Sequence, residues 1–227
     1  MRSGGGGLFV SDSDKAMLHR ALTQGMRDEV SLILFVDDTG VSKDLVELAE
    51  MLAGITPKVK VDVQKVEDGK NQRFKDMRLE HWPVMILSRE EFLRIRYYGV
   101  PLGYELPAIA DGLVDLSNLR TPLSPKAKAA LATVRRKANI KVFVSVTCPY
   151  CPTVARHAYR AAVESPRVTA EIIDAQAFPD LAARHSVMGT PKVILNDNLD
   201  ITGAMGDVEF FEKLRDSDHS LIDSMYG

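Results

Sequence analysis

The two cysteines of this chain lie three positions apart, in the run Cys148-Pro149-Tyr150-Cys151. Two cysteines placed at random in a chain of this length would show that spacing roughly once in a hundred arrangements, so the spacing is informative. Thiols one helical turn apart can exchange a disulfide with a partner, because a second thiol releases the partner that the first has captured. The motif therefore predicts thiol-disulfide exchange, with Cys148 as the catalytic nucleophile and Cys151 as the catalytic resolving thiol.

The surroundings of the motif favour a reactive thiolate at Cys148. The motif follows an apolar strand expected at Lys141–Val144 and opens a helix expected to run to about Val163. Unpaired N–H groups and the positive end of the helix dipole lower the pKa of a thiol at such a position, from ~8.5 to about 3.5–7.5. Pro149 suits the first helical position, whereas Pro152 is expected to distort the start of the helix.

A second candidate element is Gly189-Thr190-Pro191, directly before another apolar strand. A proline at such a position is often in a turn, and a cis peptide bond there would aim the Thr190 backbone toward the dithiol and offer hydrogen bonds to an extended substrate. Tyr150 either contacts a partner or is an exposed spacer. We predict that Pro149, Tyr150, Thr190 and Pro191 bind the substrate.

The order of the predicted elements is the same in both halves of the chain. Helix, strand, helix, strand, short helix, two strands and helix follow one another before residue 118, and again from a helix expected between Ser124 and about Ala138. A shift of 108 residues places Gly40 on Cys148 and Pro83 on Pro191. One fixed offset with one order of elements indicates a duplicated unit.

Each half predicts a mixed sheet with helices on both faces, which is the plan of the thioredoxin fold. The predicted fold class is therefore α/β, with two tandem thioredoxin-fold units, each a mixed central sheet flanked by helices. The expected divisions are a flexible N-terminal tail at 1–10, a first unit at 11–120 and a second unit with the dithiol at 121–227. The first unit is expected to be redox-silent, because its matching stretch, Thr39–Lys43, contains no sulfur.

Composition restricts the class of partner. The 227 residues are 45% hydrophobic and carry a formal net charge of −2, from 29 basic and 31 acidic side chains. No bulk positive charge favours nucleic acid or an anionic membrane, so protein or small-molecule partners are expected. The N-terminus does not resemble a signal peptide, and the apolar run Leu32–Val36 is too short to cross a bilayer. The sequence predicts a soluble, cytoplasmic protein.

Two segments carry a resemblance to a known family. Cys148-Pro149-Tyr150-Cys151-Pro152 followed by Val187-Met188-Gly189-Thr190-Pro191-Lys192 resembles the second half of the archaeal and bacterial protein disulfide oxidoreductases, which are tandem, glutaredoxin-like proteins with the thioredoxin fold. More distantly, the chain is similar to the N-terminal part of the flavoprotein component of alkyl hydroperoxide reductase. Members of the first family commonly have a second C-x-x-C motif in the first unit, which this chain lacks.

The resemblance implies exchange with protein disulfides and regeneration of the dithiol by a thioredoxin-reductase-like flavoprotein or by glutathione. The alternative function is a redox-sensing adaptor or an electron-transfer module for a peroxidase system.

Other readings of the cysteine pair are a metal site, an inert structural pair, or a glutaredoxin-type cluster site shared by two chains. Structural zinc usually takes four ligands, the chain has no further cysteine, and its five histidines show no ligand spacing. No metal and no cofactor are therefore expected. His157, two turns after Cys148, is a candidate base or a solvated helix position.

Overall fold

The computed structural model describes residues 8–67 and 70–217. Within these ranges, no helix has the length and apolar character needed to cross a membrane. The greater part of the expected flexible tail, residues 1–7, lies outside the described residues, and so does residue 69, where a helix expected near 69–78 would begin. Val10, which the sequence placed in the tail, is buried in the core, and the Leu8 N–H donates to the Glu47 carboxylate at 3.0 Å.

The described residues alternate between helices and strands in the predicted order. The first half contains α1 (Asp12–Gly25), β1 (Val30–Val36), α2 (Gly40–Ile55), β2 (Val59–Lys65), α3 (Gln72–Asp76), β3 (Val84–Arg89), β4 (Phe92–Tyr98) and α4 (Glu105–Asn118). The second half contains α5 (Pro125–Ala132), β5 (Ala138–Val144), α6 (Cys151–Glu164), β6 (Val168–Asp174), α7 (Pro179–Arg184), β7 (Lys192–Leu195), β8 (Leu199–Thr202) and α8 (Asp207–Asp216).

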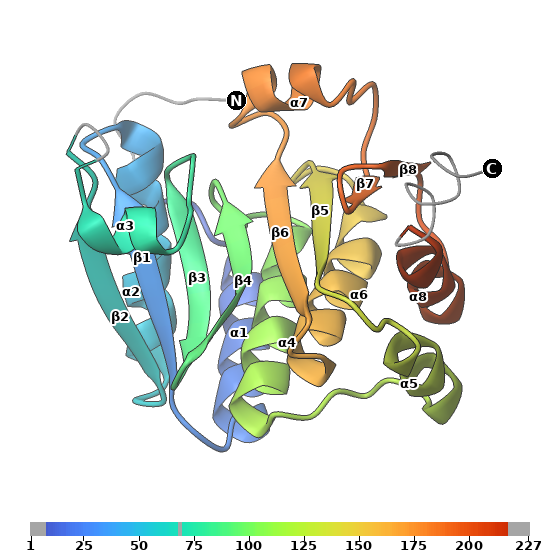
Figure 1. The fold of residues 1–227 in the computed structure, drawn as a ribbon. Helices are drawn as coiled ribbons and strands as arrows, with labels where there is room; N and C mark the ends of the chain where they lie inside the picture. Colours follow the sequence, from blue (N-terminus) through green and yellow to red (C-terminus); the bar gives the residue numbers. More distant parts are fainter. Residues whose placement is uncertain (1–7, 68–69, 218–227) are drawn as a thin grey trace.

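All eight strands form one mixed sheet in the order β2-β1-β3-β4-β6-β5-β7-β8 (Figure 1). The first four strands come from the first half of the chain and the last four from the second, in the same relative order. Parallel pairing of β4 with β6, from Ile95 opposite Ala170 to Tyr98 opposite Ile173, joins the two halves. The predicted fold class is confirmed, with the addition that the two units share one continuous sheet.

The sheet is buried on both faces over most of its width, which explains why β1 and β5 read as apolar runs rather than as alternating patterns. The larger core lies between the sheet and a layer that includes α1, α2, α4 and α6. A smaller core lies on the opposite face, where residues of α3 and α7 pack against the sheet. Helices α4 and α6 pack against each other on the face of the sheet that carries the larger core, next to the junction of the two units (Figure 1).

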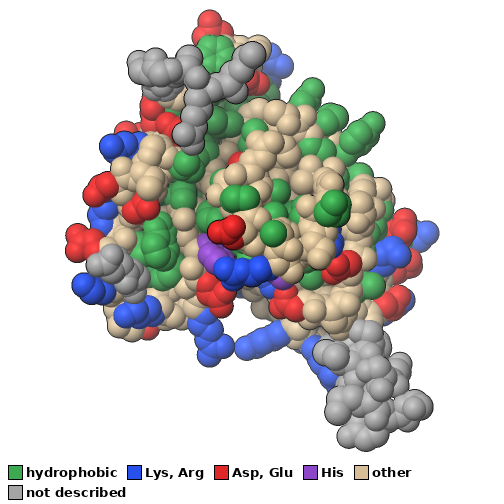
Figure 2. All heavy atoms as spheres, turned by 90° about the horizontal axis from the view of Figure 1, so that it is seen from above, with side chains coloured by type: hydrophobic (Ala, Val, Ile, Leu, Met, Phe, Trp, Pro, Cys, Tyr) green, Lys and Arg blue, Asp and Glu red, His purple; other side chains and the backbone are tan. Residues whose placement is uncertain are grey.

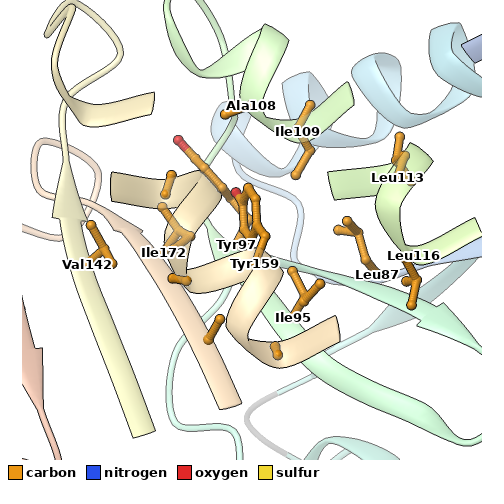
Figure 3. Packing of buried hydrophobic residues seen from close by; sticks show 14 of the residues in the cluster. Leu87, Ile95, Tyr97, Ala108, Ile109, Leu113, Leu116, Val142, Tyr159 and Ile172 are labelled. Atoms are coloured by element: carbon orange, nitrogen blue, oxygen red, sulfur yellow. The ribbon is translucent and has the colours of Figure 1, made fainter. Parts of the chain in front are cut away.

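Helix α4 belongs to the first unit but packs against α6 of the second. Its Ile109 and Leu113 belong to the same buried cluster as Ile95 of β4 and Tyr159 of α6, as labelled in Figure 3. Two ion pairs reinforce this contact: the Arg156 guanidinium lies 2.5 Å from the Asp111 carboxylate, and Arg160 lies 3.2 Å from Asp115. The packing therefore positions the start of α4 relative to the start of α6.

Two predicted helix boundaries were wrong. Helix α6 begins at Cys151 rather than at Cys148, because a helix that included Pro149 would need an N–H at Pro152 to bond the Cys148 carbonyl. Pro152 instead lies in the first helical turn, where no such bond is required. Helix α5 ends at Ala132, and Ala138 starts strand β5, where it lies opposite Val168.

Candidate active site

The dithiol lies where β5 ends and α6 begins. Cys148 is half-buried in the connecting loop, and its N–H donates to the Ser145 carbonyl oxygen at 2.9 Å. Cys151 is the first residue of α6 and its side chain is completely buried. Both thiols are free in this structure. One sulfur is therefore accessible to a partner and the other is reached only through it.

The two thiols differ in acidity. Partial burial alone would raise the pKa of Cys148, but hydrogen bonds from the Cys151 thiol and from the N–H groups of Tyr150 and Cys151 stabilise its thiolate, and the pKa is lowered. Burial, followed by the hydrogen bond to Cys148, raises the pKa of Cys151 to about 12. The geometry therefore provides one activated sulfur and one that needs a proton acceptor.

The structure brings Thr190 and Pro191 to the dithiol. The Cys148 thiol lies 3.5 Å from the Thr190 carbonyl oxygen, to which it donates, and the Thr190–Pro191 peptide bond is cis. Pro191 is buried at the entry of β7, whereas Pro149 and Tyr150 are exposed in the loop before α6. All the predicted site residues therefore lie around one accessible sulfur.

A buried carboxylic acid from the first unit lies close to this site, and the sequence analysis missed it. Glu105 begins α4, is completely buried, and neither carboxyl oxygen has a hydrogen-bond partner among the described residues. Burial raises its pKa to about 8, although Arg156 acts in the opposite direction. Glu105 is thus protonated near neutral pH and can gain or lose a proton in the working range of a thiol enzyme.

The surroundings connect Glu105 with the buried thiol. Burial raises the pKa of Tyr97 far above its usual range, and the charges of Glu105 and Cys151 both raise it further, so each of these two groups lies within electrostatic range of Tyr97. Burial also raises the pKa of Asp174, a second acid that acts on both Glu105 and Tyr97. Figure 3 shows Tyr97 beside Tyr159 at the junction of the two units.

Sequence reasoning had a weak signal for Glu105. An acidic residue before an apolar helical run is typical of a first helical turn, where it interacts with the helix dipole at the surface. The position of Glu105 in α4 fits that pattern, so nothing in the local sequence indicates burial. The carboxyl group is buried among groups that lie elsewhere in the chain, including Tyr97, Arg156 and Asp174.

The corresponding place in the first unit has a closed polar network instead of thiols. Asp37 accepts hydrogen bonds from the Ser42 hydroxyl at 2.6 Å and from Trp82 Nε1 at 3.2 Å. Burial alone would raise the pKa of Asp37, but bonds from Ser42 and Thr39 lower it to about 2. The Trp82–Pro83 peptide bond is cis, like its counterpart at Thr190–Pro191.

His157 faces away from the candidate site. The ring is buried rather than solvated, lies 3.1 Å from the Met205 carbonyl oxygen through Nε2, and packs against Phe210 and Phe211. Burial lowers its pKa, which keeps the ring neutral. Within residues 8–67 and 70–217, no cluster of three or more His, Cys, Asp or Glu side chains has the arrangement of a metal site.

Gly103 connects the start of α4 to the loop that carries the dithiol. Its φ is +55°, and an added Cβ would lie 2.4 Å from the Val146 carbonyl oxygen, which also accepts the Tyr104 N–H.

Gly103→Ala should therefore lower the free energy of unfolding by about 2–4 kcal/mol and make Cys148 alkylation faster. Urea unfolding measures the first effect. Gly40→Ala is the control, because nothing lies within 4 Å of its Cβ position; equal losses in the two variants would contradict the assignment.

Comparison with known proteins defines the class. The sequence pattern of the family described as "Thioredoxin domain" matches residues 138–216, which extend from β5 to α8 and contain both cysteines. This match identifies residues 138–216 as a thioredoxin-like domain.

Particular relatives and structures agree with this class. The alkyl hydroperoxide reductase AhpF from Xanthomonas campestris pv. phaseoli is 22% identical over 75% of this chain and 30% of its own length. The crystal structure of the NTD_N/C domain of AhpF from Enterococcus faecalis has a TM-score of 0.83 at 22% identity, covering 91% of this chain and all of that chain. A protein disulfide oxidoreductase from Aeropyrum pernix has a TM-score of 0.80 at 23% identity, covering 92% and 93%. The structural likenesses show the fold, and the chain spans about a third of the length of the curated relatives it matches.

Proposed function

We propose that this protein is a thiol-disulfide oxidoreductase that exchanges the Cys148/Cys151 pair with protein disulfides. The observation that carries the proposal is the inequality of the two thiols: an accessible sulfur with a lowered pKa lies beside a buried sulfur with a pKa of about 12. Exchange requires this division of roles, since one sulfur must attack and the other must wait until the partner is bound.

The steps balance in atoms and electrons. The Cys148 thiolate attacks one sulfur of the partner's disulfide, a mixed disulfide forms, and the partner's other sulfur leaves as a thiolate. Cys151 then loses its proton and attacks Cys148, which releases the partner's second thiolate and leaves a Cys148–Cys151 disulfide. Two electrons pass from this chain to the partner, and the partner takes up two protons.

Glu105 is the group proposed to accept the Cys151 proton. A thiol with a pKa of about 12 is too weak an acid to attack without help at neutral pH. A carboxyl with a pKa of about 8 is mostly protonated at pH 7, so the proposed acceptor is its ionised fraction, which grows as the pH rises toward 8 and above. The strand before the motif has no acid, and the proposed acceptor, Glu105, belongs to the first unit. The first unit, although redox-silent in this proposal, therefore completes the site of the second.

The proposal includes a division of the chain into two units between residues 120 and 121. It also includes a reductant that supplies the electrons. A thioredoxin-reductase-like flavoprotein or glutathione would reduce the Cys148–Cys151 disulfide, in a reducing compartment such as the cytoplasm. The second candidate function, an electron-transfer module for a peroxidase system, has support from the relatives described as alkyl hydroperoxide reductases.

A turnover experiment tests the proposal. The reduced protein, at a concentration far below that of a protein disulfide and a flavoprotein reductase, should reduce many disulfides per molecule. A single turnover, with no further reaction in the presence of reductant, would support a redox-sensing adaptor instead. Transfer to a peroxidase disulfide at a much higher rate than to unrelated protein disulfides would support the peroxidase module.

Exposed apolar side chains near Cys148 provide the proposed docking surface for protein partners. Met188 is 97% exposed, Tyr150 67% and Tyr104 53%, and they come from three separate loops of both units. Met188 lies two residues before Thr190, whose carbonyl oxygen contacts the Cys148 thiol. An extended partner segment could therefore pair with the Thr190 backbone while its side chains cover these apolar groups.

A charge at position 188 should weaken docking without changing the dithiol. We expect Met188→Glu to lower kcat/KM for protein disulfides by about tenfold, since burying a carboxylate against an apolar partner surface is costly. The rate with a small aromatic disulfide should change little, because such a molecule needs no extended contact. Leu119→Glu is the matched control, as Leu119 is also an exposed apolar side chain but follows the far end of α4. Equal losses with both kinds of disulfide would remove Met188 from the docking surface.

A further inference from the structure

A hollow separates the two units on the face of the sheet that carries α3 and α7. It lies over β4, β6 and β5, has a volume of about 640 Å³, and is walled by residues next to α3 on one side and by residues of α7 on the other. We call it the junction groove. Figure 2 shows a notch in this view where Lys and Arg side chains lie at the rim together with Asp and Glu side chains, and His side chains lie further in. The dithiol lies outside the lining of this groove.

The floor of the junction groove differs from the rest of this sheet face. Under α3 and α7 the side chains are apolar, as in Phe35 and Ile194. Between the two helices, Arg96, Glu171 and Lys141 lie side by side on three adjacent strands. Charged side chains in the middle of a sheet face are stable where water or a polar ligand covers them. The charged residues of β4, β5 and β6 therefore make the sheet face between α3 and α7 polar, and no helix among the described residues covers it.

The charged side chains on the floor of the junction groove form ion pairs and hydrogen bonds with one another and with neighbouring residues. Arg96 lies 3.0 Å from a Glu171 carboxylate oxygen, and Lys141 lies 2.5 Å from Asp197. The other Glu171 oxygen accepts a bond from the Asn139 amide at 3.1 Å. Because these groups hold one another in place, the floor is a rigid polar surface rather than a set of free charges.

The charges that remain lie on the walls, where two arginines outnumber one acidic residue, Glu80. Arg78, after α3, and Arg184, at the end of α7, line opposite sides, and neither guanidinium has an ion pair or hydrogen bond to a described residue. A second hollow of about 620 Å³ continues along the same face and shares Asn139 and Asp197 with the groove. Together the two are lined by eight Lys and Arg residues against three Asp and Glu residues, although the whole chain is slightly acidic. The local charge favours an anion.

Aromatic rings line the same space. His81 and Tyr98 lie edge to face, with ring centroids 6.5 Å apart, and His185 packs against Phe143. A hollow of this volume accepts a molecule of nucleotide size. Arginine guanidinium groups bind phosphate oxygens in pairs. We propose that the junction groove binds a small organic phosphate, with the phosphate groups against Arg78 and Arg184 and a planar ring against His81 and Tyr98.

Titration with ADP tests this site on the full-length protein, with calorimetry as the measurement. Saturable binding is expected, with fluorescence of Trp82, the single tryptophan next to His81, as a second signal. The double variant Arg78→Gln/Arg184→Gln should weaken ADP binding by at least about tenfold, because two charge-assisted contacts are lost. Both side chains are exposed, so the unfolding temperature should stay the same.

Two controls make the outcome decisive. Arg120→Gln removes an exposed arginine outside both hollows and should leave ADP binding unchanged. Adenosine, which lacks the phosphates, should not compete with ADP. Failure of ADP to saturate below ~10 mM would overturn the proposal. Equal affinity of the double variant and the unmodified protein, or equal binding of adenosine and ADP, would overturn it as well.

Discussion

Cys148→Ser is expected to abolish disulfide reduction, with a loss on the order of a thousandfold or more. Serine keeps the volume of the side chain but cannot form the sulfur nucleophile that captures a partner. Cys151→Ser should have a different effect: the Cys148 thiolate still attacks, but no buried thiol releases the partner. Mixed disulfides between Cys148 and partner proteins should therefore accumulate in that variant.

Non-reducing electrophoresis and mass spectrometry of the trapped species measure this difference. The double variant Cys148→Ser/Cys151→Ser is the control, because it should trap nothing. Trapping by Cys148→Ser, with little or none by Cys151→Ser, would reverse the assigned roles. That outcome would also contradict the exposure of the two sulfurs, since Cys151 is completely buried in this structure.

Glu105→Gln is expected to make the fold more stable at alkaline pH. Burial raises the pKa of Glu105 from 4.5 to about 8, so the folded protein holds a proton that the unfolded chain releases above 4.5. The stability contributed by the protonated carboxyl is complete below pH 4.5 and is lost as the pH rises through 8. Glutamine has no such loss. By pH 9 the free energy of unfolding of the variant should exceed that of the unmodified protein by about 2–4 kcal/mol.

The same substitution should slow the chemistry. Without the carboxylate, the Cys151 proton has no acceptor at Glu105, and release of a mixed disulfide should become about ten times slower at pH 8 and above, where at least half of Glu105 is ionised, and should change less at pH 7. Stopped-flow measurement of partner release separates this step from the attack by Cys148. Glu212→Gln, at an exposed position of α8, is the control for both measurements. A variant that is more stable but releases partners at the normal rate would limit Glu105 to a structural role.

The dithiol and the tandem plan could be predicted from local patterns. The C-x-x-C spacing, the apolar runs of β1 and β5 and the recurrence of an X-Pro strand entry at Pro83 and Pro191 are each visible within a few residues. The start of α6 could not be predicted in the same way, because two prolines near Cys148 compete for the first turn. The first residue of α6 depends on which backbone carbonyl groups of the first turn accept a hydrogen bond from an N–H four residues later. The hydrogen bonds of the complete helix determine this.

The sequence by itself predicted the cysteine pair that we propose as reactive, the order of the elements and their duplication, because these predictions depend on neighbouring residues and on a fixed offset. Tertiary structure alone decided that Glu105 is buried beside the loop that carries the dithiol, since Arg156 and Asp174, which act on its carboxyl group, and Val146, which accepts the neighbouring Tyr104 N–H, lie far from it along the chain. Tertiary structure also placed Arg78 and Arg184 on opposite walls of one groove. A side chain's pKa and partners depend on what packs around it in space, and that information is distributed over the whole chain.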